Sequence, residues 1–191
     1  PTAQEAILEY TSQALSDRGR LTAALLELAD APLRTEEVIR ILQRATDISP
    51  ESAAGAVREL NKWHLLQATR EARIALHETF RLTARQIRND LPAATIRAAL
   101  QALVESLEPV PGRPENDIDR FRLYLRLLPS VDRAGDLVGL VTNDSEYLYE
   151  LGLGGELQRI LEGCIDTPQL SSSDRFWALD ALAFWKIQDD D

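Results

Sequence analysis

A short apolar run passes directly into an amphipathic helix near the middle of the chain, and this junction constrains the fold more than any other stretch. Residues 74–76 are typical of the end of a strand. Apolar residues then recur at helical spacing: Leu76, Phe80, Ala84 and Ile87. His77 and Glu78 occupy the junction itself. The free N–H groups and the positive dipole end of a helix can hold Glu78 or a bound anion there. We therefore expect any function that the sequence reveals to begin at this junction, at His77 and Glu78.

Length and charge narrow the class of protein. The 191 residues suffice for one ordinary domain or two small ones, and 45% of them are hydrophobic, which supports a packed core. The net charge is −10, and residues 91–191 hold 18 acidic but 9 basic residues. We therefore expect neither strong DNA binding nor attachment to an acidic membrane, since both need a basic face. No apolar run is long enough to span a bilayer.

Two further features concern the compartment and the extent of the chain. The single cysteine, Cys164, cannot form an internal disulfide and suits a reducing compartment, so we expect a cytoplasmic protein. The chain contains no methionine and has no stop signal in its final residues. From this we expect a piece of a longer protein.

Cap signals divide the first half into short helices. Residues 3–15 predict a first helix with Ala6, Ile7, Tyr10 and Ala14 on one face. Ser16 or Asp17 caps a second helix, which Pro32 ends. Thr35 caps a third helix, and Ser49 followed by Pro50 begins a fourth.

A hairpin is expected after these helices. Residues 63–69 and 74–76 are strand-like, and the polar residues 70–73 connect them. Three helices followed by a small hairpin is the order of a winged helix-turn-helix. One core is expected to contain seven side chains: Leu25, Leu28, Val38, Ile41, Val57, Leu60 and Leu76.

The second half predicts short helices separated by Pro and Gly. A loop is expected at residues 109–114. Helices are expected near 93–108, 115–128, 132–141, 145–151, 155–165 and 173–187. Paired short helices favour a helical stack, although no clean repeat period is present. The predicted fold class is thus all-α with a minor β-wing: a linking helix over 1–19, a winged helix over 20–91, and a helical, repeat-like domain over 92–191.

Residues 6–90 resemble a known domain. Leu8, Tyr10 and the leucine-rich second helix look like the start of the winged-helix domain of STAND-type signalling NTPases, relatives of plant immune receptors and of the apoptosome ATPase. That domain ends in a Met-His-Asp or Leu-His-Asp motif, to which Leu76, His77 and Glu78 are similar, with Glu78 in place of the usual aspartate. The resemblance implies that His77 contacts a nucleotide diphosphate and that helical repeats follow. No Gly-x-x-x-x-Gly-Lys-Ser/Thr loop occurs in the chain, so an ADP- or ATP-binding core would have to lie upstream.

Other candidate residues have plainer interpretations. We expect Arg81, Arg85 and Arg88 to form a solvated or ion-paired helix face, with anion binding as the alternative. Arg58 and Lys62 lie on the third of the three helices, which reads DNA in winged-helix regulators, but acidic neighbours favour a solvated face. His64 is expected to be structural or solvent-facing, and Cys164 is assigned no chemistry. Three aromatic residues are expected in the core or on a surface for a following repeat: Trp177, Phe184 and Trp185.

These features predict a non-enzymatic, regulatory chain. It would couple an upstream nucleotide-binding domain to a helical sensor, and bind protein partners through its helical half. Two alternatives stay open: a winged-helix transcriptional regulator with a helical ligand or dimerisation domain, and a helical protein-binding scaffold. Too few histidines and cysteines are present for a zinc site, and no catalytic motif was found.

Overall fold

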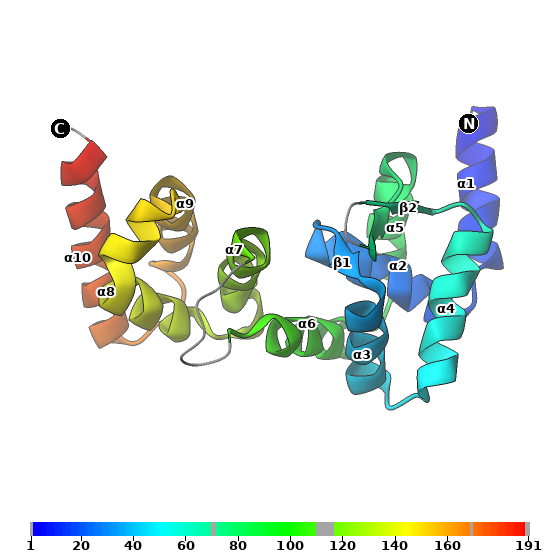
Figure 1. Ribbon diagram of the computed structural model, residues 1–191, viewed down its shortest axis with the longest axis horizontal. Helices are drawn as coiled ribbons and strands as arrows, with labels where there is room; N and C mark the ends of the chain where they lie inside the picture. Colours follow the sequence, from blue (N-terminus) through cyan, green and yellow to red (C-terminus); the bar gives the residue numbers. More distant parts are fainter. Residues whose placement is uncertain (1, 70–71, 110–116, 169, 190–191) are drawn as a thin grey trace. The chain divides into compact units, whose positions relative to one another are not determined.

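The chain forms two compact units in a computed structural model that describes residues 2–69, 72–109, 117–168 and 170–189 (Figure 1). Unit 1 is Pro1–Ser106 and unit 2 is Leu107–Asp191. The helix after Leu91 therefore groups with the first part of the chain, whereas the sequence-based division fell at 91/92. The assignment of 20–91 to a winged-helix domain stays a prediction.

Helices dominate both units. They make up 77% of the structure, alongside one small sheet, so the coarse expectation of a helical protein with a minor β element is confirmed. Unit 1 contains α1 (Ala3–Ala14), α2 (Asp17–Ala29), β1 (Leu33–Arg34), α3 (Thr35–Thr46), α4 (Pro50–Lys62), β2 (Leu66–Ala68), β3 (Arg73–Leu76), the 3-10 helix η2 (Glu78–Phe80), α5 (Arg81–Asp90) and α6 (Ala93–Leu107). Unit 2 contains α7 (Ile118–Leu127), the 3-10 helix η3 (Leu128–Val131), α8 (Ala134–Glu150), α9 (Gly154–Cys164) and α10 (Ser172–Asp189).

The sheet in unit 1 has three antiparallel strands in the order β1-β3-β2. The hairpin of β2 and β3 was predicted, and its register pairs Leu66 with Leu76. Strand β1 was not predicted, because two residues are too few to show a period-2 pattern. It pairs Leu33 with Ile74 and so places the start of α3 beside β3.

Helix α2 lies at the centre of unit 1. It is buried on nearly all sides and packs against α4, α5 and β3, as expected of a helix that is apolar around most of its circumference. Ser16 caps it through its hydroxyl, as predicted. Six of the seven predicted core residues are buried, and Leu28, in the last turn of α2, is half-buried.

Helix α1 turns its apolar stripe outward. Ile7 and Tyr10 are 65% and 67% exposed, and Ala6 and Ala14 are exposed as well. Thr11, which donates its hydroxyl hydrogen bond to the Ile7 carbonyl, is buried instead. The periodicity thus located the helix but did not identify the side that packs on α5.

The next two helices begin at local signals. Ser49 and Pro50 cap and open α4 as predicted. The prediction of Thr35 as the cap of α3 is wrong by one residue. Arg34 occupies that position because it pairs in β1, and its backbone N–H donates to the Glu37 carboxylate at 3.0 Å.

Unit 2 follows the predicted helices closely. Helix α8 covers two of them, and Asp144, with φ −125° and ψ 26°, interrupts its helical geometry between the two. Helix α10 packs on α8 and α9. The predicted loop over 109–114 lies almost wholly outside the described residues. No helix in the described part of the chain has the length and apolarity to cross a membrane.

Candidate functional site

His77 lies between β3 and η2, at the surface of unit 1. Its backbone N–H donates to the Leu65 carbonyl at 2.7 Å, which ties the junction to the start of the hairpin. Its Nδ1 accepts from the Thr79 backbone N–H at 3.4 Å and lies 2.9 Å from the Thr79 hydroxyl. The bond from the Thr79 N–H needs Nδ1 as an acceptor, and the neutral tautomer that makes it carries the proton on Nε2. The side chain is exposed, and no partner of Nε2 is recorded among the described residues.

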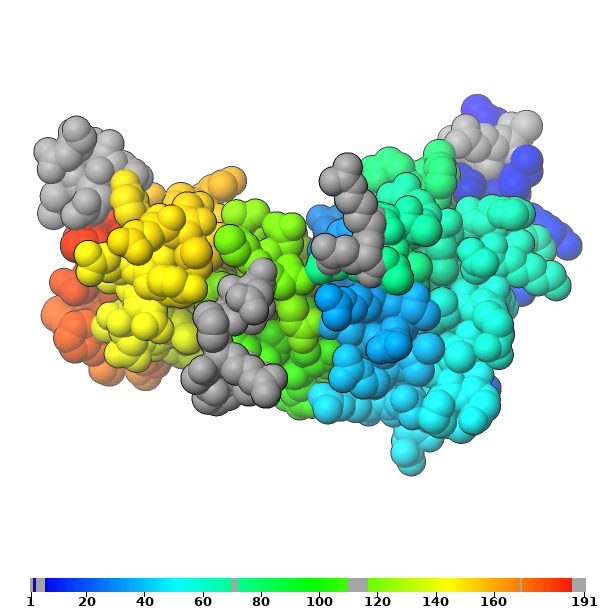
Figure 2. All heavy atoms as spheres, viewed as in Figure 1, coloured from blue at the N-terminus to red at the C-terminus, as the bar shows by residue number. Residues whose placement is uncertain are grey.

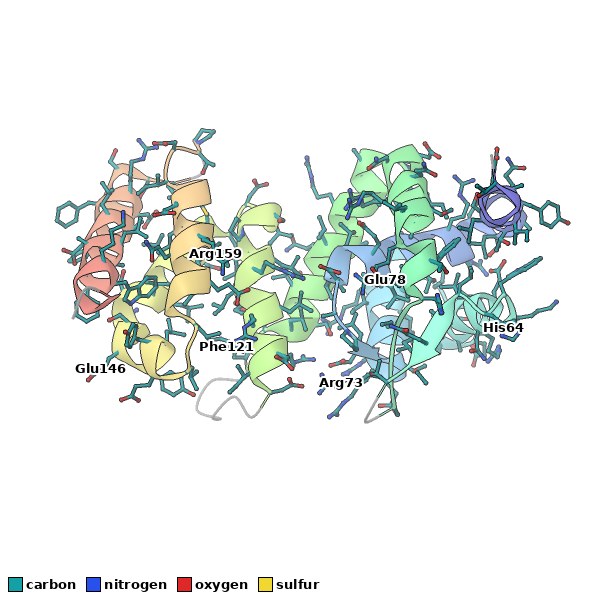
Figure 3. The ribbon with its side chains drawn as sticks, turned by 90° about the horizontal axis from the view of Figure 1, so that it is seen from above. His64, Arg73, Glu78, Phe121, Glu146 and Arg159 are labelled. Carbon is teal, nitrogen blue, oxygen red and sulfur yellow. The ribbon has the colours of Figure 1, made fainter. Side chains whose placement is uncertain are left out.

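Glu78 does not occupy the helix N-terminus in the way the sequence suggested. A 3-10 turn precedes α5, and the Phe80 N–H donates to the His77 carbonyl, so the turn satisfies these donors itself. The Glu78 carboxylate instead lies 3.0 Å from Arg81 Nε. Figure 3 labels Glu78 at this turn. Arg81 also pairs with Asp30, the C-terminal cap of α2.

The remaining arginines of α5 are ion-paired, as expected. Arg85 Nε and Arg88 Nη1 lie 2.9 Å and 2.7 Å from the two oxygens of Glu27. Glu27 belongs to the buried side of α2, and its side chain is 6% exposed. Charge-assisted bonds to one buried carboxylate engage these arginines within unit 1, so the alternative of an anion site on this face receives no support.

The outward side of α4 carries free cations. Arg58 and Lys62 are exposed, one helical turn apart, and no ion pair to either is recorded in the described part of the chain. His64 follows the helix with φ 55°, in the left-handed region, and is exposed as expected. It lies between Trp63, the C-cap of α4, and strand β2, which starts at Leu66. Figure 2 shows α4, in cyan, on the visible surface, and Figure 3 labels His64.

The aromatic residues of α10 divide between two sides of the helix. Trp185 is buried in unit 2, whereas Trp177 and Phe184 are exposed. Cys164 is buried, and its thiol donates to the Ile160 carbonyl. Burial raises the pKa of this thiol, which keeps it protonated and unreactive near neutral pH.

A polar cluster in unit 2 has no counterpart in the sequence predictions. Arg133 Nη2 lies 2.8 Å from a Glu108 oxygen, and its Nε lies 2.5 Å from Asp136. Hydrogen bonds to these two carboxylates raise the pKa of Arg133. Arg133 Nη2 also lies 3.5 Å from the Tyr124 hydroxyl oxygen. Burial raises the pKa of the Tyr124 hydroxyl. The cluster is an ion-pair network. Asp136 is a local partner of Arg133, three residues away, but Glu108 lies 25 residues away, too far for a local pattern to show.

No group of three or more metal-ligating side chains is present in the described residues. Comparison of the chain with models of known protein families, with curated proteins and with solved structures found no match.

Proposed function

We propose that this chain is the regulatory and protein-interaction portion of a nucleotide-dependent signalling switch, which couples an upstream ATPase core to a helical sensor. The observation that carries the proposal is the state of His77. Nδ1 faces the turn that His77 caps, and in the tautomer that accepts the Thr79 N–H, Nε2 offers an N–H at the surface. An imidazole held in this tautomer is suited to donate to a phosphate oxygen.

The surroundings of His77 limit what the chain can contribute to a nucleotide site. Arg81 pairs with both Asp30 and Glu78. Arg85 and Arg88 both pair with Glu27. The chain also has no phosphate-binding loop motif. His77 therefore offers a single donor, and an upstream domain would have to hold the rest of an ADP or ATP molecule. Such a domain supplies phosphate binding, while His77 reports and stabilises the closed arrangement.

The order of elements in unit 1 supports the proposal. Helix α2, strand β1, helices α3 and α4, and the β2–β3 hairpin follow one another with β3 in the middle of the sheet. This is the order expected of a winged helix-turn-helix. In that interpretation His77 ends the wing.

The outward stripe of α1 supports contact with another domain. Ile7 and Tyr10 are exposed on successive turns of a helix that precedes the central helix α2. Exposed apolar side chains in a continuous stripe favour a protein partner. We assign this stripe to the upstream nucleotide-binding domain.

One strong hydrogen bond from His77 is enough to shift the equilibrium between a closed and an open arrangement. A charge-assisted bond from Nε2–H to a diphosphate contributes on the order of 1.5–3 kcal/mol. Its loss shifts a closed-to-open equilibrium by roughly ten- to a hundredfold. The first test is the reading frame upstream of Pro1: the proposal needs a phosphate-binding loop there, and a frame that encodes none would refute it.

Duplex-DNA binding is the second candidate function, because Arg58 and Lys62 are exposed on the outward side of α4 and no ion pair to them is recorded among the described residues. Glu51 lies on the same side of the helix, and the net charge of −10 opposes contact with phosphates. We therefore expect an anisotropy titration with duplex DNA to give no submicromolar, salt-sensitive binding. Such binding, lost in Arg58→Ala and Lys62→Ala, would promote the regulator over the switch.

A further inference from the structure

The outward face of α10 is apolar and carries one free acid at its centre. Its inner face packs on α8 and α9 through Ala178, Ala181, Leu182 and Trp185. The opposite face exposes large apolar side chains, and their exposed fractions are high: Phe176 60%, Leu179 55%, Trp177 44% and Phe184 42%. The rings of Phe176 and Trp177 contact each other edge to face at 5.3 Å. In Figure 1, α8 and α9 both lie on the same side of α10.

Asp180 lies in the middle of this face. In a helix, residues three and four apart are neighbours. The neighbours of Asp180 are therefore Phe176, Trp177, Ala183 and Phe184, none of which is charged. No hydrogen bond or ion pair of Asp180 is recorded in the described residues. The nearby cations of α10 are engaged elsewhere, because Lys186 lies 3.8 Å from Glu162 and Arg175 donates to the Thr167 carbonyl.

A free carboxylate within an apolar face restricts what can cover that face. Covering an ionised carboxylate without a partner is strongly unfavourable, whereas a cation placed opposite it compensates for the lost water. The occupant must therefore combine apolar side chains with a central basic group. A helix that carries Lys or Arg within its apolar stripe has this chemistry and matches the length of α10.

The exposed apolar helix faces of a second copy, on α10 and α1, do not fit. Two-fold pairing of α10 with itself brings the centres of the two faces together, and each centre is Asp180. The outward stripe of α1 offers no cation either, because the charged residues of that helix are Glu5 and Glu9. Self-association through α10 would thus oppose two carboxylates.

We propose that the outer face of α10 docks an amphipathic helix of a partner protein, and that a Lys or Arg within the apolar stripe of that helix pairs with Asp180. This inference deepens the protein-binding part of the proposed function and does not depend on His77. Phe176, Leu179 and Phe184 supply apolar contact, and Asp180 selects the partner by charge.

The test uses two synthetic helical peptides of about 18 residues with leucines at i, i+3, i+4 and i+7. One peptide carries Arg in the middle of the leucine stripe and the other carries Glu. Their affinities for the full chain are measured by fluorescence anisotropy. We expect the Arg peptide to bind at least about tenfold more tightly than the Glu peptide. Asp180→Lys should reverse this order, and Phe176→Ser should weaken both complexes.

Glu146→Lys is the matched control. Glu146 is an exposed acid on α8 and is labelled in Figure 3. Its replacement by Lys changes the charge as Asp180→Lys does, but outside the outer face of α10. It should leave the preference for the Arg peptide unchanged, with circular dichroism confirming that each variant is folded. Equal affinities of the two peptides for wild type, binding of neither, or an unchanged order in Asp180→Lys would overturn the proposal. Self-association that Phe176→Ser abolishes would assign the face to a second copy instead. If the peptide experiment contradicted the docking face on α10, the proposed nucleotide contact of His77 would still stand or fall by its own test.

Discussion

Glu27 links the central helix of unit 1 to α5 through two arginines. Its carboxylate is nearly buried and accepts from both Arg85 and Arg88. Glu27→Gln removes the charge but keeps the shape, so one guanidinium meets an amide N–H group instead of an oxygen. We expect the free energy of unfolding to fall by about 1–3 kcal/mol, measured by urea denaturation.

Glu9→Gln is the control for this change, because Glu9 is an exposed acid on α1. It should alter the free energy of unfolding by less than about 0.5 kcal/mol. If the two variants proved equally stable, the Glu27 pairs would contribute nothing to folding.

Single residues also show where sequence-based prediction stops. The arginine face of α5 was predicted as a solvated or ion-paired face because its spacing is local. Its partner was not predicted, because Glu27 lies 58 and 61 residues away from the two arginines. The position of His77 at a strand-to-helix junction was likewise a local pattern and is confirmed. The pairing of Glu78 with Arg81 replaced the predicted helix-end role, because a 3-10 turn satisfies its own donors.

At the scale of elements, the start of α2 is held by α4. Ser16 donates its backbone N–H to Glu59 at 2.8 Å and its hydroxyl to the other Glu59 oxygen. A Cβ atom on Gly19 would lie 2.6 Å from that oxygen. Gly19→Ala should therefore displace Glu59 from Ser16 and lower the free energy of unfolding by about 1 kcal/mol, despite the better helix propensity of alanine.

Gly139→Ala is the matched comparison on α8, since no atom lies within 4 Å of a Cβ placed there. It should raise the free energy of unfolding by roughly 0.5–1 kcal/mol. The same urea titration measures both variants. Stabilisation by Gly19→Ala would show that the close approach of Glu59 is unimportant.

Element boundaries were predictable where a cap residue marks them. Ser16 and Ser49 begin helices as their sequences indicate, because an N-cap acts within one turn. Strand β1 moved the N-cap of α3 from Thr35 to Arg34, and a two-residue strand exists only through its distant partner β3. The side of α1 that faces solvent could not be predicted either, because periodicity identifies an apolar stripe but not the element that packs on it.

At the scale of the whole molecule, the end of unit 1 decides which fragment folds well. Unit 1 ends at Ser106, so α6 belongs to it, and Arg44 of α3 lies 3.9 Å from Glu105 of α6. Ala99 and Leu103 of α6 are fully buried. A fragment of residues 1–107 should therefore be more stable than one of residues 1–91, by about 2 kcal/mol or more. Equal urea midpoints and slopes for the two fragments would instead support a domain boundary at 91/92, as expected from the sequence.

The proposed switch depends on whether Nε2 of His77 has a function beyond the turn that Nδ1 caps. His77→Ala removes the cap and the donor together, whereas His77→Asn keeps a short side-chain acceptor for the Thr79 N–H. In this chain alone, Ala should cost less than about 1 kcal/mol of stability and Asn less still. These two variants therefore separate a capping role from a nucleotide contact.

The measurement that tests the account most directly is the ADP affinity of the full-length protein, compared among wild type, His77→Ala and His77→Asn. We expect both variants to bind ADP roughly ten- to a hundredfold more weakly than wild type and to raise basal signalling. Equal affinity and equal basal activity in all three proteins, or a loss in His77→Ala that His77→Asn fully restores, would make His77 a structural cap and contradict the switch.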